Sequence, residues 1–207
     1  MRCIGICGAS GSGKSTLAQE LCQRVAGTTL IINQDAYYHD HSSLPFEERR
    51  HLNYDEPNIF DHDLLLADVR ELLAGRAITR KGYDYTEHRR ADTQERIQPA
   101  DLLIVEGIHT FYDARLREAF DMSLYMRVEP DICLLRRIQR DINERGRFVD
   151  DIAAQYLTTV RPMYERYIRS YIEHADIIVA KGGKNARIVD LLAGYINAQR
   201  AAQHGAY

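Results

Sequence analysis

The sequence predicts an α/β fold in which helices flank a parallel β-sheet. Two observations carry this prediction. First, short apolar, β-branched runs alternate along the chain with amphipathic helical patterns, which is typical of a parallel sheet covered by helices. Second, no internal repeat, low-complexity tract or linker separates two halves of the 207 residues, and a hydrophobic content of 45% is enough to fill one core. We therefore expect a single domain over residues 1–207.

Five short apolar runs predict the strands of the sheet. They cover residues 2–7, 28–33, 102–105, 122–126 and 177–179. The first run precedes a predicted helix over residues 14–26. In that helix Leu17, Leu21 and Val25 recur every four residues, so their side chains form one stripe that we expect to be buried.

Two further predicted helices carry signals at their ends. Residues 62–74 have a similar apolar pattern and precede Gly75, a residue suited to the end of a helix. Residues 130–143 begin with Pro130, which suits the first helical turn because an N–H group would have no partner there. Asp131 in that turn interacts favourably with the helix dipole. We expect both segments to cover the sheet.

Two segments are less regular. Residues 150–175 are rich in tyrosine and are interrupted by Pro162, which predicts one kinked helix or two abutting helices. Residues 76–99 alternate between apolar and polar side chains and then become polar throughout. This pattern predicts a small inserted β-hairpin rather than a crossover through the core.

Composition and charge exclude several classes of function. The chain has 27 Lys and Arg against 30 Asp and Glu, a net charge of −3, so a generally basic nucleic-acid binder is not expected. No apolar stretch approaches the ~20 residues of a membrane span, and the N-terminus lacks the basic and apolar regions of a signal peptide. We therefore expect a cytoplasmic protein with no membrane partner. The four cysteines form no C-x-x-C pair and fall in apolar patterns, which favours buried side chains over a metal or redox role.

The most informative segment is GASGSGKS at positions 8–15. It fits the pattern G-x-x-x-x-G-K-[ST] between a predicted strand and a predicted helix, so the sheet is expected to be of the P-loop NTPase type. Backbone N–H groups of such a loop surround a phosphate, Lys14 reaches the β- and γ-phosphates of a nucleoside triphosphate, and the Ser15 hydroxyl is placed to bind Mg²⁺. The predicted phosphate-binding residues are Gly8, Ala9, Ser10, Gly11, Ser12, Gly13, Lys14, Ser15 and Thr16.

Two carboxylates end predicted strands near this loop. Glu106 follows the apolar run 102–105, and a charge at that point is expected to meet either a Mg²⁺ ion and its water shell or only solvent. Asp35 follows the run 28–33 at the same edge of the sheet, where it can accept a proton from an attacking hydroxyl. The alternative for Asp35 is an ordinary turn residue.

An arginine-rich segment follows in the second half of the chain. Five arginines crowd into twelve residues: Arg136, Arg137, Arg140, Arg145 and Arg147. Arg136 and Arg140 share a helical face, whereas we expect Arg145 and Arg147 to lie in a loop made mobile by Gly146. Such a run is often a solvated basic face. In a phosphoryl-transfer enzyme it can instead form a lid, here over about residues 136–155, that places guanidinium groups against the phosphoryl group and excludes water.

Longer motifs resemble one family. They are GASGSGKST, QDAYY, NYDEPNIFDHDLL, YDYTEHRR, PADLLIVEGI, RRIQRDINERGR, QYLTTVRPM and ADIIVAKGGKN. In this order they resemble the uridine-cytidine kinase branch of the P-loop kinases, which is related to phosphoribulokinase, and the resemblance runs from Ile4 to about Leu192. It implies phosphorylation of uridine, and of cytidine, at the 5′-hydroxyl, with ATP or GTP as phosphate donor and Mg²⁺ as cofactor. It also implies a homotetramer with feedback binding of CTP or UTP.

The resemblance implies roles for individual residues as well. The implied catalytic residues are Asp35, as general base for the 5′-hydroxyl, Lys14, Arg137, Arg140 and Arg145. The implied magnesium site, with its water shell, is Ser15, Glu106 and Asp35. The implied nucleoside contacts are Asp55 at the ribose, Tyr83 and His88 at the pyrimidine, and Arg137, Arg147 and Gln155.

Some positions depart from the family pattern, and two other functions stay open. The departures are Lys81, Arg127, Ala180 with Lys181, and the segment 167–174. None is an implied catalytic group, but they leave the preferred nucleoside undecided. The first alternative is a related kinase that acts on another ribosyl or sugar alcohol. The second is a non-catalytic nucleotide-binding regulator, against which Asp35 argues because a regulator needs no base for an organic hydroxyl.

Overall fold

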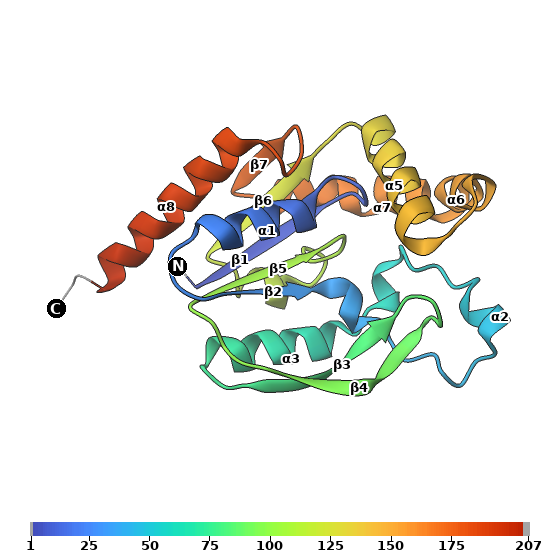
Figure 1. Cartoon of the computed structure of the whole chain (residues 1–207), viewed down its shortest axis with the longest axis horizontal. Coiled ribbons are helices and arrows are strands. Elements are labelled where there is room, and N and C mark those ends of the chain that lie inside the picture. Colours follow the sequence, from blue (N-terminus) through green and yellow to red (C-terminus); the bar gives the residue numbers. More distant parts are fainter. Residues whose placement is uncertain (1, 205–207) are drawn as a thin grey trace.

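The computed structural model describes residues 2–204 and contains a five-stranded parallel sheet with the strand order β2-β5-β1-β6-β7 (Figure 1). The strands are β1 (Cys3–Gly8), β2 (Thr29–Asn33), β5 (Leu102–Gly107), β6 (Met122–Arg127) and β7 (Ile177–Ala180). All five correspond to predicted strands, with bounds that differ by at most two residues. The predicted α/β class with a parallel sheet is therefore confirmed.

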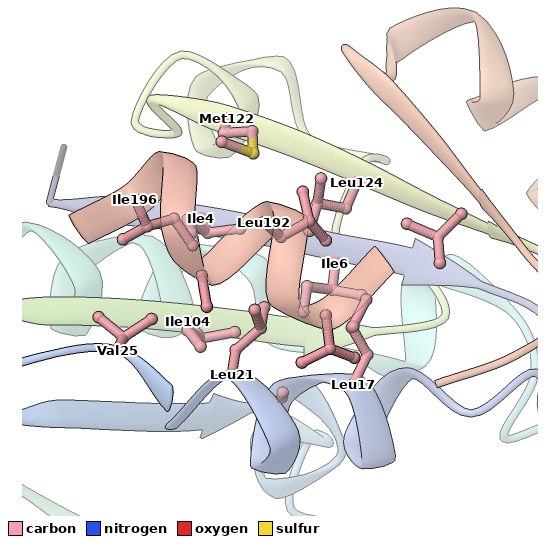
Figure 2. Packing of buried hydrophobic residues seen from close by; sticks show 14 of the residues in the cluster. Ile4, Ile6, Leu17, Leu21, Val25, Ile104, Met122, Leu124, Leu192 and Ile196 are labelled. Atoms are coloured by element: carbon pink, nitrogen blue, oxygen red, sulfur yellow. The ribbon is translucent and has the colours of Figure 1, made fainter. Parts of the chain in front are cut away.

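Helix α1 (Lys14–Arg24) packs on one face of the sheet, as its apolar stripe predicts. Leu17 and Leu21 are fully buried and belong to the same core cluster as Ile4 of β1 (Figure 2). Burying each leucine side chain contributes about 1.5–3 kcal/mol. The helix ends before Val25, whose backbone is extended. This packing fixes the start of α1 directly after the phosphate loop.

A second helix, α8 (Ala186–His204), covers the same face and was not among the predicted helices. Val189, Leu192 and Ile196 are buried in the core cluster shared with α1 (Figure 2). Their spacings of three and four residues are the helical signal that identifies this segment. The sheet therefore has a complete helical layer on this side.

The opposite face is covered by α3 (His62–Leu73), which confirms the helix predicted over residues 62–74. Successive residues of a strand point to opposite faces, so Cys3 of β1 faces this layer, where Leu65 and Val69 of α3 are fully buried. The side chain of Asp61 accepts a hydrogen bond from the N–H of Leu64 and caps the first turn of α3.

The predicted hairpin is also present. Strands β3 (Ile78–Asp84) and β4 (Arg89–Ile97) form a separate two-stranded antiparallel sheet whose base packs against α3. The pairing register shifts between Lys81 and Tyr83, and such an irregularity turns the end of a strand. The shift lies where the hairpin departs from the core, just before Tyr83 and Tyr85.

Helix α5 (Pro130–Arg145) is two residues longer than predicted, which corrects the placement of Arg145. Arg145 is the last helical residue and not a loop residue. The helix ends at Gly146, which adopts a left-handed φ of 62° and donates its N–H to the carbonyl of Asp141. Of the five arginines in this segment, Arg147 is the one that lies in the loop before α6 (Val149–Gln155).

The tyrosine-rich segment is broken into four pieces. They are α6, a π-helical turn η3 (Tyr156–Val160), α7 (Arg161–Arg166) and a 3₁₀ segment η4 (Ile168–His174). Pro162 has no N–H to donate to the carbonyl four residues earlier, and its ring crowds that carbonyl, so the preceding turn widens. The interruption predicted at Pro162 is present, and the outcome is nearer to the first alternative, one irregular helix, because α6, η3 and α7 follow one another without a gap.

Short helical segments connect these elements. They are η1 (Gln34–Tyr37), α2 (Phe46–Arg49), η2 (Pro57–Ile59) and α4 (Ala114–Arg117). Within residues 2–204, no helix is both long and apolar enough to span a bilayer.

The parallel arrangement decides where the site lies. The carboxyl ends of β1, β2 and β5 meet at one edge, so the phosphate loop, Asp35 and Glu106 are brought together there. Figure 1 shows α5, α6 and the end of the hairpin at the same end of the molecule. The end of α5 contacts the hairpin directly, because the Arg145 guanidinium lies 5.5 Å from the centre of the Tyr85 ring.

Candidate active site

The phosphate loop connects β1 to α1 and is held close to the rest of the fold. Gly13 has a φ of 93°, and a Cβ atom there would lie 2.9 Å from the backbone nitrogen of Gly183, so only glycine fits. The buried side chain of Lys14 curls back and donates from Nζ to the carbonyl of Ala9 at 3.0 Å. Among residues 2–204, the buried hydroxyl of Ser12 has no hydrogen-bond partner, and it can donate to a phosphate oxygen. The loop therefore has the form of an anion cradle.

A hydroxyl and a carboxylate suited to a cation lie beside this loop. Ser15 Oγ donates to Glu106 Oε1 at 2.8 Å. Burial raises the pKa of Glu106, the Lys14 ammonium opposes that rise, and the negative charge of Asp35 adds to it. A buried, partly compensated carboxylate next to a hydroxyl fits Mg²⁺, which binds through one or two carboxylates and the phosphates of a substrate. No group of three His, Cys, Asp or Glu side chains in the described chain is arranged to hold a metal.

Asp35 stands at the end of β2, in the first turn of η1. Its N–H donates to Asn33 Oδ1 at 2.8 Å, and this cap fixes the turn. Asn33 pairs in register with Glu106 of the neighbouring strand, so Asp35 and Glu106 end adjacent strands. The structure therefore brings the two carboxylates predicted for this edge together, although their chemical roles stay predictions.

Asp55 is the second carboxylate on the acceptor side. Its buried carboxyl group lies 3.8 Å from the guanidinium of Arg137 and accepts a hydrogen bond of 3.2 Å from the Thr159 hydroxyl. Burial raises the pKa of Asp55, and Arg137 opposes this rise. Burial also raises the pKa of Tyr38, and the negative charges of Asp35 and Asp55 contribute to the rise. The Tyr38 phenol is therefore within electrostatic reach of both carboxylates.

Rings from three segments form an aromatic cluster, which comprises Tyr38, Tyr54, Tyr83, Tyr85 and His88. Tyr54 stacks on His88 with centroids 4.8 Å apart, and Tyr38 and Tyr83 lie at 4.9 Å. The buried hydroxyl of Tyr83 makes no hydrogen bond of good geometry within the described part of the chain, and the Tyr54 hydroxyl lies beside it. Tyr85 extends the cluster, since its ring centre is 5.3 Å from that of Tyr83. Apolar ring faces and an unsatisfied phenol together suit a planar, polar-edged ligand.

His88 is the last residue of the hairpin turn and belongs to this cluster. Its φ of 50° is in the left-handed region, which turn residues including histidine adopt. Burial lowers the pKa of His88, and the charges of Arg147 and Arg49 lower it further. The imidazole is therefore neutral near pH 7 and can both donate and accept a hydrogen bond.

Arg137 joins the arginine-rich segment to the phosphate loop. It is buried, and it donates to Ser10 Oγ and to Gln155 Oε1, both at 3.0 Å. Arg147 donates to the same Gln155 oxygen at 2.7 Å. The structure thus places Arg137, Gln155 and Asp55 next to one another, as their predicted nucleoside contacts require.

Asp141 forms ion pairs with Arg140, Arg145 and Arg147. It was not among the residues that the sequence singled out. It is fully buried, and Arg140 donates to its Oδ1 at 2.9 and 2.8 Å. Arg147 and Arg145 lie 3.3 and 3.7 Å away. Burial disfavours the charged form of Asp141, but the surrounding arginines prevail and lower its pKa. The sequence signal that could have identified Asp141 is its position: it is an acidic residue within a run of arginines, one helical turn after Arg137.

Other contacts could not be read from the sequence. The tertiary fold places Tyr85, Tyr54 and Thr159 at the site, and no motif in the sequence indicated a role for them. Arg136 points elsewhere, since a Cβ atom on Gly182 would lie 2.9 Å from its guanidinium. It therefore reaches the loop after β7 and not the cluster around Asp141.

Comparisons with known proteins find similar sequences over nearly the whole chain. Residues 3–187 match the model of the phosphoribulokinase / uridine kinase family. A uridine kinase from Erwinia tasmaniensis is 46% identical over 199 residues, which cover 94% of this chain and 93% of that protein. A uridine kinase from Bacillus subtilis is 43% identical over 190 residues, covering 91% and 90%. Among solved structures, phosphoribulokinase from Rhodobacter spheroides has a TM-score of 0.62 at 15% identity over 86% of this chain and 69% of that chain, which supports the fold alone.

Proposed function

The chain belongs to the phosphoribulokinase / uridine kinase family, and we propose that it transfers the γ-phosphoryl group of ATP to the 5′-hydroxyl of uridine. Cytidine is the second substrate, and the reaction serves pyrimidine salvage in the cytoplasm. The observation that carries the proposal is one juxtaposition: Tyr38 of the aromatic cluster lies within electrostatic reach of Asp35 and Asp55, and the same cluster holds the neutral His88 and the buried Tyr83 phenol. A pyrimidine offers a ring face for stacking and an edge for hydrogen bonds, which are the two contacts that this cluster supplies.

The residues of the chain divide the reaction between them. Asp55 binds the ribose hydroxyls, while the aromatic cluster holds the base, so that the 5′-hydroxyl faces Asp35. Asp35 takes the proton of that hydroxyl as the oxygen attacks the γ-phosphorus. Lys14, with Arg137, Arg140 and Arg145, stabilises the charge that develops on the phosphate oxygens.

Ser15 and Glu106 would hold Mg²⁺, with Asp35 at its water shell. When bound, the ion would neutralise part of the charge on the phosphate oxygens. ATP is the proposed donor, with GTP as the alternative, because the phosphate loop contacts phosphates and not the purine.

The proposal extends to regulation and assembly on the strength of the family resemblance. CTP or UTP would bind as feedback inhibitors, since each carries a pyrimidine for the aromatic cluster and a triphosphate for the phosphate loop. The chain would form a homotetramer, and exposed apolar side chains such as Phe148, Leu157 and Leu191 supply surface for contacts between copies.

The direct test is an assay of ADP release over a panel of acceptors with ATP and Mg²⁺. We expect uridine and cytidine to be phosphorylated with kcat/KM at least about 10²-fold above purine nucleosides, because a hydrogen-bonding site rejects ligands whose polar edge does not match it. Efficient turnover of another sugar alcohol, with uridine inactive, would establish a related kinase of different specificity instead. ATP binding without turnover of any acceptor would establish the non-catalytic regulator.

The aromatic cluster gives a prediction about substrate selection. We expect His88→Ala and Tyr83→Ala to raise the KM for uridine by about 10-fold or more and to leave the KM for ATP within about 2-fold, since both side chains are assigned to the base and neither to the triphosphate. Initial rates at varied uridine and varied ATP measure both constants.

His51→Ala is the matched control, because His51 is an exposed histidine in the segment before α3. It should leave both constants unchanged. Equal losses for uridine and ATP in the His88 and Tyr83 variants would indicate a defect in folding or in the lid and would contradict their assignment to the base.

A further inference from the structure

His109 has a role beyond the site residues assigned above. It lies two residues after β5 and is fully buried. Its backbone N–H donates to Gln34 Oε1 at 2.8 Å. Its ring nitrogens Nδ1 and Nε2 lie 2.9 Å from the hydroxyl of Tyr171 and 2.8 Å from the carbonyl oxygen of Asp55. One residue thus joins three segments that are far apart in the sequence.

The partners of the ring determine its tautomer. A carbonyl oxygen can only accept, so the proton of the neutral imidazole is on Nε2 and is donated to Asp55. Nδ1 is then the acceptor for the Tyr171 hydroxyl. Burial lowers the pKa of His109 to about 4, so the neutral ring persists at physiological pH. The side chain therefore has both of its hydrogen-bonding positions filled in one orientation.

The two ends of His109 hold the chain next to the two carboxylates of the acceptor side, through the backbone of Asp55 and the side chain of Gln34. The ring fixes the carbonyl of Asp55, while the N–H of Asp55 is fixed by Asn53 Oδ1 at 3.1 Å, so the backbone at Asp55 is held from both sides. The backbone N–H of His109 holds the side chain of Gln34, which is fully buried and directly precedes Asp35.

We propose that His109 is a positioning residue that sets the place of Asp55 relative to Asp35, and so aligns the ribose for attack. This inference rests on the proposed function. Because the ring contacts Asp55 and not the substrate, removing it should weaken binding only through the groups that Asp55 contacts, the ribose hydroxyls. A residue that merely fills the core would affect every ligand of the site alike.

The test compares two nucleosides in one variant. In His109→Leu, which leaves the carbonyl of Asp55 and the hydroxyl of Tyr171 unpaired, we expect the Kd for uridine to rise about 10-fold. The Kd for 2′,3′-dideoxyuridine, which lacks the 2′- and 3′-hydroxyls and keeps the 5′-hydroxyl, should rise less than about 3-fold. The KM for ATP should be unchanged, and His109→Gln, whose amide can donate to the same carbonyl, should recover part of the uridine affinity. Calorimetry and initial rates give these values.

Phe111→Leu is the matched control, since Phe111 is equally buried two residues away and has no side-chain hydrogen bond. This variant should raise the Kd for uridine and the Kd for 2′,3′-dideoxyuridine by the same factor. If His109→Leu raises both Kd values by the same factor, the proposal is overturned, and His109 is then a residue that only packs in the core.

A second measurement does not depend on activity or on a variant that folds. ¹⁵N NMR of the histidine rings in the intact protein should show His109 protonated on Nε2 and bare on Nδ1 from pH 8 down to about pH 5, because burial lowers its pKa to about 4. The opposite tautomer would remove the bond to Asp55 and overturn the proposal. If the tautomer is as expected and the nucleosides do not bind, the proposed function fails, and the positioning of the Asp55 backbone stands.

Discussion

Asp35→Asn is expected to lower kcat with uridine by about 10²–10⁴-fold. The amide has the size of the carboxylate and can still accept a hydrogen bond from the 5′-hydroxyl, but it cannot take the proton as the phosphoryl group moves. The Asn33 cap involves the backbone N–H of Asp35 and not its side chain, so the turn should persist. Steady-state rates at saturating uridine and ATP measure the loss, and calorimetry should show nearly unchanged ATP binding.

A magnesium titration separates two causes of that loss. Asp35 raises the pKa of Glu106, so the two charges interact, and removing one can weaken Mg²⁺ binding at Glu106. A deficit restored at high Mg²⁺ points to the metal, whereas a deficit that persists at saturation points to the general base. Asp40→Asn is the matched control, because Asp40 is an exposed aspartate five residues further along the chain. Turnover of uridine by Asp35→Asn within a few-fold of the parent at saturating Mg²⁺ would show that Asp35 is a turn residue.

Lys14→Ala should reduce kcat/KM by about 10³-fold while the fold remains intact. The ammonium stabilises the charge that develops between the β- and γ-phosphates in the transition state. The hydrogen bond that Lys14 makes is to Ala9 within the same loop, so its loss does not uncouple the loop from the sheet. Initial rates measure the activity, and circular dichroism during thermal unfolding measures the integrity of the fold.

Lys81→Ala, which removes an exposed lysine of the hairpin, should leave the rate unchanged. Unchanged turnover in Lys14→Ala would contradict the assignment of residues 8–16 to the triphosphate. A large drop in the unfolding temperature would instead show that Lys14 supports the fold, and the rate could then not be attributed to the phosphate contact.

Local sequence signals were sufficient for the parts of the fold that short-range physics decides. The alternation of apolar strands and amphipathic helices gave the parallel sheet, because each pattern buries a face of fixed periodicity. The glycines of the phosphate loop, with Gly13 at positive φ, are required by backbone geometry and are visible as a motif. The C-terminal helix carried an equally local signal in Val189, Leu192 and Ile196, and it was missed although the spacing is regular.

The candidate site was predictable to the extent that parallel strands have a common edge. Asp35 and Glu106 each follow an apolar run, so the sequence alone indicated that they meet beyond β2 and β5. Arginines were harder to place, because a helix boundary decides which side each one faces. Gly146 ends α5 one residue after Arg145, and this cap keeps Arg145 helical where a loop was expected.

The sequence by itself determined the α/β class, the phosphate loop and the two carboxylates at the edge of the sheet, since each depends on spacing within a few residues. Only the tertiary structure decided which distant side chains complete the site. Asp141 became the centre of the arginines, and His109 came to bridge Asp55, Gln34 and Tyr171, across separations of 54, 75 and 62 residues. A buried polar group must find hydrogen-bond partners wherever the packed chain supplies them. The partners of such a group are close in space and not in the sequence, so no periodic sequence pattern identifies them.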